Sequence, residues 1–365
     1  MKNLLYTVFA SLCLLLLTAC NDENELLKKG EMLFLKHKGA SMPLLVRGNF
    51  NSDVILLMVH GGAGGSSGSH IEDFNEMIEP EYMVAYWDQR HAGSSQGNFD
   101  KEDLTIDLMA EDMQMVINLL KHKYGSDKKI FAVGHSWGVQ LTTYYLLNQE
   151  NQLQGAILTN GSHSSETEYS ARLDFVNTFA SEMIQEGLEI PKKIEIEGET
   201  FTSLEQVVTW TEQNDPIDSW RKLKILWPLV DDVVLQYVND TYVLPYNQRI
   251  SAGELLFKSP YNQLIGFINL RRTGQLINDF DNEKSIQEFY DYRPEMDQIT
   301  LPVCLIWGKY DQIIGLEVAD SYYDVIGTPQ EDKELVILEN SGHSGLATEN
   351  VKFSQTVISF VEEHK

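Results

Sequence analysis

A pentapeptide in the first half of the chain constrains the fold more than any other feature. The sequence GHSWG at 134–138 follows directly on an apolar run at 130–133 and precedes a helix-like segment at 139–147. This is the G-x-S-x-G pattern between a strand and a helix. The predicted turn is so tight that its two glycine positions have no room for side chains. It would present the Ser136 hydroxyl at the carboxyl end of a strand, with a helix N-terminus behind it.

Further apolar runs predict strands that alternate with helices. The predicted strands lie at 32–36, 44–47, 54–59, 83–87, 130–133, 155–159, 303–307 and 334–338. Strands without polar alternation are typical of a parallel sheet that is buried on both faces. Apolar residues at helical spacing predict helices at 104–124 and 351–361. The chain is therefore predicted to be an α/β protein, with a mostly parallel central sheet and helices on both faces.

The alternation stops between about residues 162 and 296. This segment contains three of the six tryptophans, Trp210, Trp220 and Trp227, and shows helical periodicity without a convincing buried strand. We predict a helical insertion that lies over the sheet. The expected organisation is a signal peptide at 1–19, a tether at 20–30, a core at 31–161, the insertion at 162–296 and the rest of the core at 297–365.

Two polar residues that follow the last two predicted strands are candidate catalytic partners of Ser136. A serine nucleophile needs a base, and the base needs an orienting acid. Asp311 lies just after the predicted strand at 303–307, and His343 follows the strand at 334–338. This order of serine, acid and histidine is the one found in sheets of this kind. We predict a catalytic triad of Ser136, Asp311 and His343, with Glu166 as a weaker alternative for the acid.

Other histidines of the chain are alternatives for the base. The candidates in predicted loops are His70, His91 and His163. All of them precede Asp311, so they are expected to be pocket walls or surface residues.

A glycine-rich loop follows the predicted strand at 54–59. It reads HGGAGG at 60–65, and such glycines let backbone N–H groups approach a substrate oxygen. We predict an oxyanion hole formed by the N–H groups of Gly62 and Trp137. A flexible turn is the alternative. A phosphate-binding loop is disfavoured because the run matches neither G-x-G-x-x-G nor the P-loop pattern and brings no lysine.

The N-terminus predicts export and lipid attachment. Lys2 precedes an apolar run at 4–17 that is shorter than the about 20 residues of a membrane span. The sequence LTAC at 17–20 resembles the bacterial lipobox, which implies cleavage before Cys20 and acylation of that residue. Acidic residues follow at 21–25, as in lipoproteins of the outer cell surface. The expected location is the bacterial cell envelope, with a lipid anchor as the only membrane attachment.

The net charge excludes several classes of partner. The chain has 54 acidic and 28 basic residues, for a formal charge of −26. Nucleic acid binding requires clustered lysine and arginine, so it is not expected. Neither H-E-x-x-H nor paired cysteine or histidine ligands occur, so we predict no metal and no cofactor. Cys304 is the remaining thiol after Cys13 leaves with the signal and Cys20 is acylated, which precludes an intramolecular disulfide.

These motifs resemble the α/β-hydrolase fold over nearly the whole chain from about residue 31. The sequence DQRHAGSS at 88–95 is similar to the D-Q-R-G-x-G-x-S segment of the proline iminopeptidase branch, and HGGAG at 60–64 to its H-G-G-P-G. Ala63 replaces a proline of that branch, His91 replaces a glycine, and the elbow begins with Gly134-His135 as in general esterases. Asp88 and Arg90 are usually structural in the family, and we expect them to pair with each other.

The resemblance implies a serine hydrolase that forms an acyl-enzyme. The favoured interpretation is an aminopeptidase of the proline iminopeptidase type that acts on short peptides. A carboxylesterase or lactonase for small acyl substrates is the alternative, and a non-catalytic surface lipoprotein is a more distant one. An aminopeptidase must bind a protonated amine, for which a carboxylate of the insertion is the natural partner. The candidates are Glu195, Glu197, Glu199, Glu205 and Glu212.

Overall fold

The computed structural model describes residues 30–97, 100, 103–149, 152–245, 268, 269, 271, 273 and 290–365. Cys20, with the predicted signal peptide and nearly all of the tether, lies outside the described residues. So does most of 246–289, a stretch within the second half of the predicted insertion.

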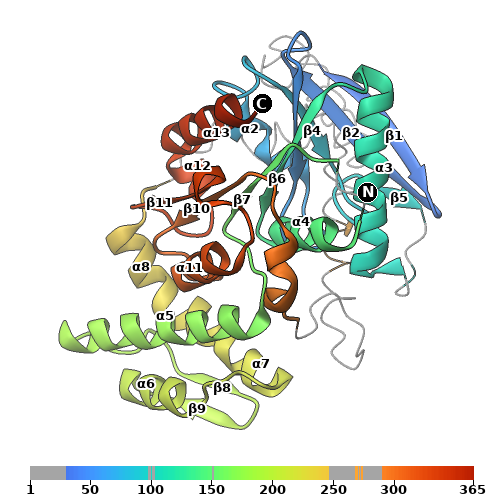
Figure 1. Ribbon diagram of the computed structural model, residues 1–365. Coiled ribbons are helices and arrows are strands. Elements are labelled where there is room, and N and C mark those ends of the chain that lie inside the picture. Colours follow the sequence, from blue (N-terminus) through green and yellow to red (C-terminus); the bar gives the residue numbers. More distant parts are fainter. Residues whose placement is uncertain are drawn as a thin grey trace, which may run out of the picture.

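The central sheet contains nine strands within the described part of the chain, in the order β1-β2-β4-β3-β6-β7-β10-β11, with β5 beside β2 (Figure 1). Its strands are β1 (Glu31–His37), β2 (Ala40–Gly48), β3 (Val54–Val59), β4 (Met83–Trp87), β5 (Gln96–Gly97), β6 (Lys129–His135), β7 (Gly155–Thr159), β10 (Val303–Gly308) and β11 (Lys333–Leu338). The pairs from β4 to β11 are parallel, whereas the pairs that involve β2 are antiparallel. The carboxyl ends of the parallel strands therefore meet at one edge of the sheet.

Helices cover both faces of this sheet. They are η2 (Ser67–His70), α2 (Ile71–Phe74), α3 (Ile106–Tyr124), α4 (Trp137–Asn148), η5 (Arg293–Gln298), α11 (Leu316–Val325), η6 (Gln330–Asp332), α12 (Gly345–Thr348) and α13 (Asn350–His364). One core, between the sheet and α3 and α4, takes Ile55, Leu57 and Val59 from β3. The other core, against α2 and α13, takes the alternate β3 side chains. Every β3 side chain is thus buried, as expected for a parallel strand covered on both faces.

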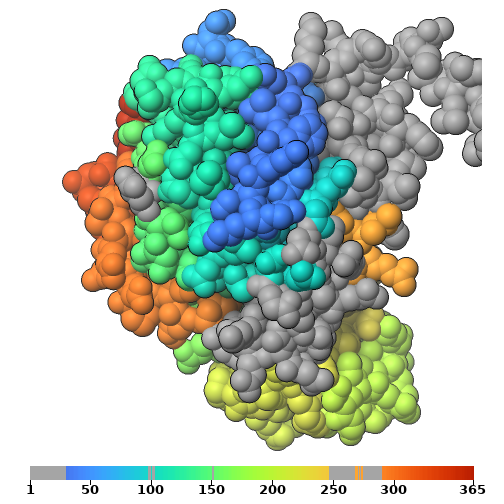
Figure 2. Space-filling model, turned by 90° about the vertical axis from the view of Figure 1, so that its right-hand side faces the viewer, coloured from blue at the N-terminus to red at the C-terminus, as the bar shows by residue number. Residues whose placement is uncertain are grey.

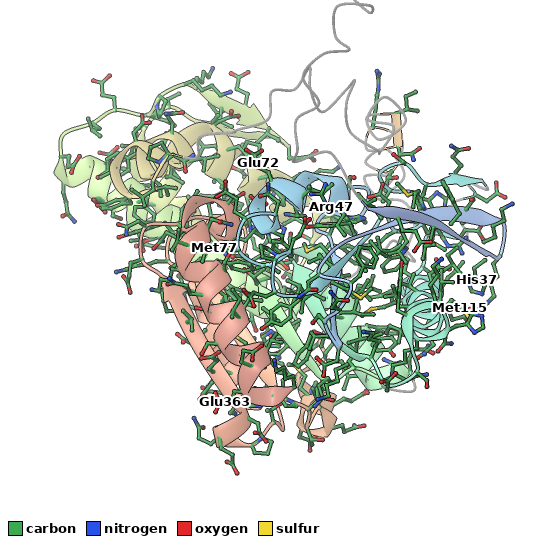
Figure 3. All side chains as sticks on the ribbon, turned by 90° about the horizontal axis from the view of Figure 1, so that it is seen from above. His37, Arg47, Glu72, Met77, Met115 and Glu363 are labelled. Carbon is green, nitrogen blue, oxygen red and sulfur yellow. The ribbon has the colours of Figure 1, made fainter. Side chains whose placement is uncertain are left out.

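The edge of the sheet at β1 is partly covered by α3. Figure 2 shows β1 and β2 in blue beside the teal α3. At this edge His37, at the end of β1, lies near the α3 residue Met115 (Figure 3). The His37 ring bonds Asp112 of α3 at 2.6 Å, so a polar contact closes the end of this interface.

The segment between β7 and β10 leaves the sheet and builds its own apolar cluster. It contains α5 (Ser165–Gln185), α6 (Leu204–Gln213), α7 (Trp220–Leu229), the π turn η4 (Val230–Val234) and α8 (Leu235–Tyr242), with a small hairpin of β8 (Ile194–Ile196) and β9 (Glu199–Phe201). Its cluster includes Phe179, Val207, Trp210 and Leu226. Figure 1 shows α6, α7 and the hairpin beyond α5, at the end of the molecule away from α13.

These observations confirm the predicted α/β class. The predicted strands agree with the observed ones to within a few residues. The helix predicted at 104–124 begins two residues later, at Ile106, because Thr105 caps it by accepting the N–H of Leu108. The hairpin β8–β9 and the two-residue strand β5 were not predicted. No helix in the described ranges combines the length and apolar character needed to cross a membrane.

Candidate active site

Ser136 lies at a strained turn between β6 and α4. Its φ of 55° and ψ of −122° are rare for a residue with a side chain. The turn requires close backbone contacts: a Cβ on Gly138 would lie 1.9 Å from the Val59 carbonyl oxygen, and one on Gly134 would lie 2.9 Å from the Gly138 oxygen. The two glycines of the pentapeptide are therefore steric requirements, as predicted. The turn is anchored by the Ser136 N–H, which donates to Thr159 O at 3.0 Å.

The structure brings Ser136, His343 and Asp311 into one chain of hydrogen bonds. His343 Nε2 is 3.0 Å from Ser136 Oγ, and His343 Nδ1 is 2.9 and 3.0 Å from the two Asp311 oxygens. A carboxylate only accepts, so Nδ1 donates to Asp311 and leaves Nε2 to accept the Ser136 proton. The Asp311 side chain is fully buried, whereas that of His343 is 15% exposed.

The Asp311 carboxylate has three further donors. The N–H groups of Ile313 and Ile314 donate to Oδ1 at 2.8 and 2.9 Å, and Asn160 Nδ2 donates to Oδ2 at 2.7 Å. Asn160 follows β7 with a φ of 52°, a conformation that asparagine tolerates better than most residues. Sequence reasoning missed Asn160, because its role depends on a contact with a residue 151 positions away.

The glycine loop lies directly against the elbow. A Cβ on Gly61 would lie 2.9 Å from Ser136 Cβ, so only glycine allows this approach. Gly62 is exposed with a φ of 44° and has no atom within 4 Å of a Cβ position. Both Gly62 and Trp137, the first residue of α4, line the same cavity as Ser136. The two residues predicted to form an oxyanion hole thus line the cavity into which the serine side chain also opens.

The D-Q-R segment after β4 is structural, but its charges do not pair as expected. The Arg90 guanidinium binds Asp112 of α3 at 2.8 and 2.9 Å, with both side chains fully buried. The Asp88 carboxylate instead accepts hydrogen bonds from the Ser66 hydroxyl and from the N–H groups of Ser67 and Ser94. The predicted pairing of Asp88 with Arg90 is therefore wrong. The loop after β4 turns Asp88 toward the glycine loop and Arg90 toward α3. Burial raises the pKa of Asp88 to about 7, against these hydrogen bonds.

A cavity of about 490 Å³ opens above Ser136. Its floor comes from the sheet edge and glycine loop, and its roof comes from the segment between β7 and β10. The roof residues are Ser162, Glu168, Tyr169, Arg172, Leu223, Trp227 and Tyr290, joined by Ile313 and Ile314. The tryptophan-rich segment thus contributes one tryptophan to the site, and Trp210 packs in its apolar cluster.

Glu168 and Arg172 form an ion pair in this roof. Both lie on α5, one turn apart, with Arg172 NH2 2.7 Å from Glu168 Oε1. The guanidinium is fully buried and stacks on the Trp227 ring, with 4.0 Å between its Cζ atom and the ring centroid. It also donates to Ile313 O from Nε and NH2. Glu168 accepts a second bond from the Tyr290 hydroxyl at 3.2 Å.

The five acids proposed from the sequence for amine binding do not line this cavity. Glu195, Glu197 and Glu199 lie on or beside the β8–β9 hairpin, each beside a lysine or arginine, and Glu205 and Glu212 are exposed on α6. The alternative acid Glu166 pairs with Arg293 on the outside of α5. Glu168 is the carboxylate that the described part of the roof supplies. No periodic pattern distinguishes it from its neighbours, because its environment is created by the folding of α5 over the sheet.

Two further histidines lie near the proposed base, His135 next to His343 and His70 next to His135. His135 lies between His70 and His343, with ring centroids 5.5 and 5.1 Å away, and its Nε2–H donates to His343 O at 3.0 Å. Burial, together with the neighbouring His343, holds the pKa of His135 well below 6.5. His70 lines the cavity, whereas His91 and His163 are buried outside it. Nowhere in the described ranges do three or more histidine, cysteine, aspartate or glutamate side chains group as metal ligands would.

This arrangement can perform acyl transfer. A hydroxyl that donates to a neutral imidazole loses its proton as it attacks a carbonyl carbon, and a buried carboxylate stabilises the resulting imidazolium. The strained φ and ψ of Ser136 keep the hydroxyl at the start of α4, where the helix N-terminus favours negative charge.

Comparison with known proteins agrees with this geometry. Residues 54–349 match the alpha/beta hydrolase fold family. The chain is similar to the proline iminopeptidase of Saccharolobus solfataricus, with 25% identity over 84% of each chain. It is also similar to the probable aminopeptidase YbaC of Bacillus subtilis, with 23% identity over 88% of this chain and 93% of the relative.

Among solved structures, the proline iminopeptidase of Mycobacterium smegmatis shares the fold with a TM-score of 0.60, at 14% identity over 92% of this chain and 98% of the other. The sequence matches, which span most of the chain, confirm the expected resemblance to the proline iminopeptidase branch. The protein is therefore a hydrolase, and the chain belongs to the α/β-hydrolase fold family.

Proposed function

We propose that the protein is a serine hydrolase in which Ser136 is the nucleophile, His343 the general base and Asp311 the orienting acid. The observation that carries this proposal is the continuous hydrogen-bonded chain from Ser136 Oγ through the His343 ring to Asp311, at the floor of the cavity. The geometry matches the requirement that a base lie within hydrogen-bond reach of the proton it removes.

The reaction would proceed through an acyl-enzyme. Ser136 Oγ attacks the substrate carbonyl carbon while its proton moves to His343 Nε2, and the carbonyl oxygen becomes an oxyanion that accepts the N–H groups of Gly62 and Trp137. Collapse of this intermediate breaks the bond to the leaving group, which takes the proton from His343. A water molecule then gives a proton to His343, attacks the acyl carbon and releases the acid and the free serine.

The favoured substrate is a short peptide with a free N-terminal amine. The relatives named proline iminopeptidase and probable aminopeptidase support this choice. The Glu168 carboxylate in the cavity roof is a suitable partner for a protonated amine, and Tyr169 and Trp227 provide apolar rings around it. Release of the N-terminal residue, proline among the candidates, follows from an amine that is held beside the scissile bond.

One observation favours the alternative, a carboxylesterase or lactonase. Arg172 already neutralises Glu168, so the described roof presents a charge pair rather than a free carboxylate. Such a roof suits uncharged acyl groups better than an isolated carboxylate would.

The first experiment tests the catalytic assignment. Wild-type protein should be labelled by a fluorophosphonate probe, and Ser136→Ala should abolish labelling with almost no change in melting temperature. His343→Ala should lower the labelling rate by about 10³-fold or more. Persistent labelling of the Ser136→Ala variant would assign the nucleophile elsewhere, and an unlabelled wild type would favour a non-catalytic lipoprotein.

The second experiment separates peptidase from esterase. A dipeptide or aminoacyl-arylamide with a free amine is compared with its N-acetylated form. The peptidase proposal predicts that acetylation lowers kcat/KM strongly, and that Glu168→Gln lowers kcat/KM for the free amine by about 10- to 100-fold, the value of one charge-assisted hydrogen bond. Glu166→Gln, on the exposed side of the same helix, is the matched control. Equal or better cleavage of the acetylated compound would support the esterase.

We also propose that the mature protein is anchored in the bacterial cell envelope by acyl chains on Cys20. The proposal rests on the lipobox-like sequence at 17–20. Two or three acyl chains would hold the protein stably where one would not.

A further inference from the structure

Gln89 of the D-Q-R segment is a fully buried amide between the two loops of the proposed oxyanion hole. Its Nε2 donates to His60 O at 2.9 Å, at the start of the glycine loop. Its Oε1 accepts the indole Nε1–H of Trp137 at 3.0 Å. One side chain thus joins the loop that carries Gly62 to the residue that supplies the second N–H.

The backbone of Gln89 strengthens the same connection. Its N–H donates to His60 Nε2 at 3.2 Å, and His60 Nδ1–H donates to Gly61 O at 2.9 Å. These two bonds require a neutral imidazole with the proton on Nδ1. Burial lowers the pKa of His60 to about 4, which keeps the ring in that form.

The far end of the glycine loop is held by Asp88, the residue before Gln89. Asp88 accepts Ser66 Oγ and the Ser67 N–H, both at 2.9 Å. The loop is therefore tied at both ends to the segment after β4, and the Gln89 side chain extends this connection to the elbow.

We propose that Gln89 is a positioning residue that sets the spacing between the Gly62 and Trp137 N–H groups. This inference rests on the proposed serine hydrolase function. An amide suits the task because it offers a donor and an acceptor on one rigid plane, one for each loop. Oxyanion holes depend on donors that are held in place before the reaction begins, so a shift of one donor reduces stabilisation of the transition state rather than binding of the substrate.

Three variants test the role. Gln89→Leu removes both side-chain bonds, and Trp137→Phe removes only the indole bond and keeps the backbone N–H. Gln89→Glu provides a pH-dependent rescue, because a protonated carboxyl can donate to His60 O and accept from Trp137, whereas an ionised one cannot donate. Thr143→Val is the control, since Thr143 is a buried polar residue of α4 that bonds Tyr322 away from the glycine loop.

The assays are fluorophosphonate labelling, hydrolysis of p-nitrophenyl acetate and inhibition by a trifluoromethyl ketone, which forms an oxyanion on the serine. Removal of a complete oxyanion-hole donor costs about 10²- to 10³-fold in kcat, so a displaced donor should cost about 10- to 100-fold. Gln89→Leu should show this loss in kcat with KM within about two-fold, and the same loss in affinity for the ketone. Thr143→Val should lower the melting temperature and keep kcat.

Two relations between variants complete the test. The double variant Gln89→Leu with Trp137→Phe should be no slower than Gln89→Leu alone, because both changes break one connection. The labelling rate of Gln89→Glu relative to wild type should be near one at low pH and should fall as the buried carboxyl ionises.

Wild-type labelling rate in Gln89→Leu, or a rise in KM at constant kcat, would overturn the proposal. A Gln89→Glu ratio that stays below one at every pH would also overturn it. If Gln89→Leu does not fold, the pH dependence of Gln89→Glu decides the question. Failure of the wild type itself to react would refute the serine hydrolase function instead, so the two failures are distinguishable.

Discussion

Asn160→Asp is the perturbation that tests the acid of the proposed triad most sharply. The substitution replaces an N–H donor by a carboxylate oxygen with almost no change in shape, and aspartate also tolerates the positive φ of this position. The new carboxylate would lie beside Asp311, where the Asn160 nitrogen is 2.7 Å from Oδ2. Two adjacent carboxylates cannot both be ionised at neutral pH, so the pair retains a proton.

The distance sets the size of the effect. Two unit charges 2.7 Å apart repel by about 6 kcal/mol at an effective dielectric constant of about 20. This corresponds to about 4 units of pKa, an upper bound because the side chains move apart. At pH 7 the proton would be shared between the two carboxyls, and Asp311 would stabilise the His343 imidazolium less. The labelling rate should fall by about 10²-fold or more, by analogy with other neutralised triad acids.

The sign of the pH dependence distinguishes this explanation from simple damage. The ratio of the Asn160→Asp rate to the wild-type rate should rise as pH increases, because the pair loses its proton and Asp311 regains its charge. Asn160→Gly removes the donor without adding a charge, so its smaller loss, about 10-fold, should not vary with pH. Asn118→Asp, on the exposed side of α3, controls for the added charge. A flat ratio for Asn160→Asp, or equal rates for the aspartate and glycine variants, would refute the reasoning.

The remaining predictions concern stability and anchoring. Asp88 has a pKa raised to about 7, so the folded protein loses stability as pH rises from about 4 to 7. Over that range the free energy of unfolding of Asp88→Asn should rise by up to about 4 kcal/mol relative to that of the wild type. Urea unfolding at several pH values measures this difference. A constant difference would contradict the pKa shift. Gly138→Ala should fail to fold or lose labelling because its Cβ meets the Val59 oxygen. Gly62→Ala should fold, with a free energy of unfolding lower by about 1–2 kcal/mol because of its positive φ. Equal melting temperatures of the two variants would disprove this. Cys20→Ser should release the protein from the membrane fraction, and its retention there would argue against lipid attachment.

The sequence was sufficient for features that depend on local patterns. The buried parallel strands are continuous apolar runs, and the positions of Ser136, Asp311 and His343 follow from the strands that precede them. The glycines of the elbow could be predicted for the same reason, since their neighbours in the chain create the crowding.

Features that depend on distant contacts were not predictable. Asn160 and Glu168 look like ordinary polar residues until the fold brings Asp311 and Arg172 beside them. The sequence instead favours five other acids of the same segment. They lie on α6 and on or beside the β8–β9 hairpin, where four are exposed and Glu199 is half-buried. Proximity in sequence predicts Asp88 as the partner of Arg90, but Asp112, 22 residues after Arg90, is the partner that packing supplies.

The hydrogen bonds from Arg172 to the Ile313 carbonyl limit how this protein can be re-engineered. Segments inserted between core strands are attractive units for exchange between relatives, because a new roof would bring a new specificity. Here one arginine of that roof holds a carbonyl two residues after Asp311. A chimaera that imports a foreign α5 would therefore disturb the loop that orients the base as well as the substrate cavity. Exchanges that begin after Gln185 keep this contact, but they replace the α6 and α7 residues that pack against α5.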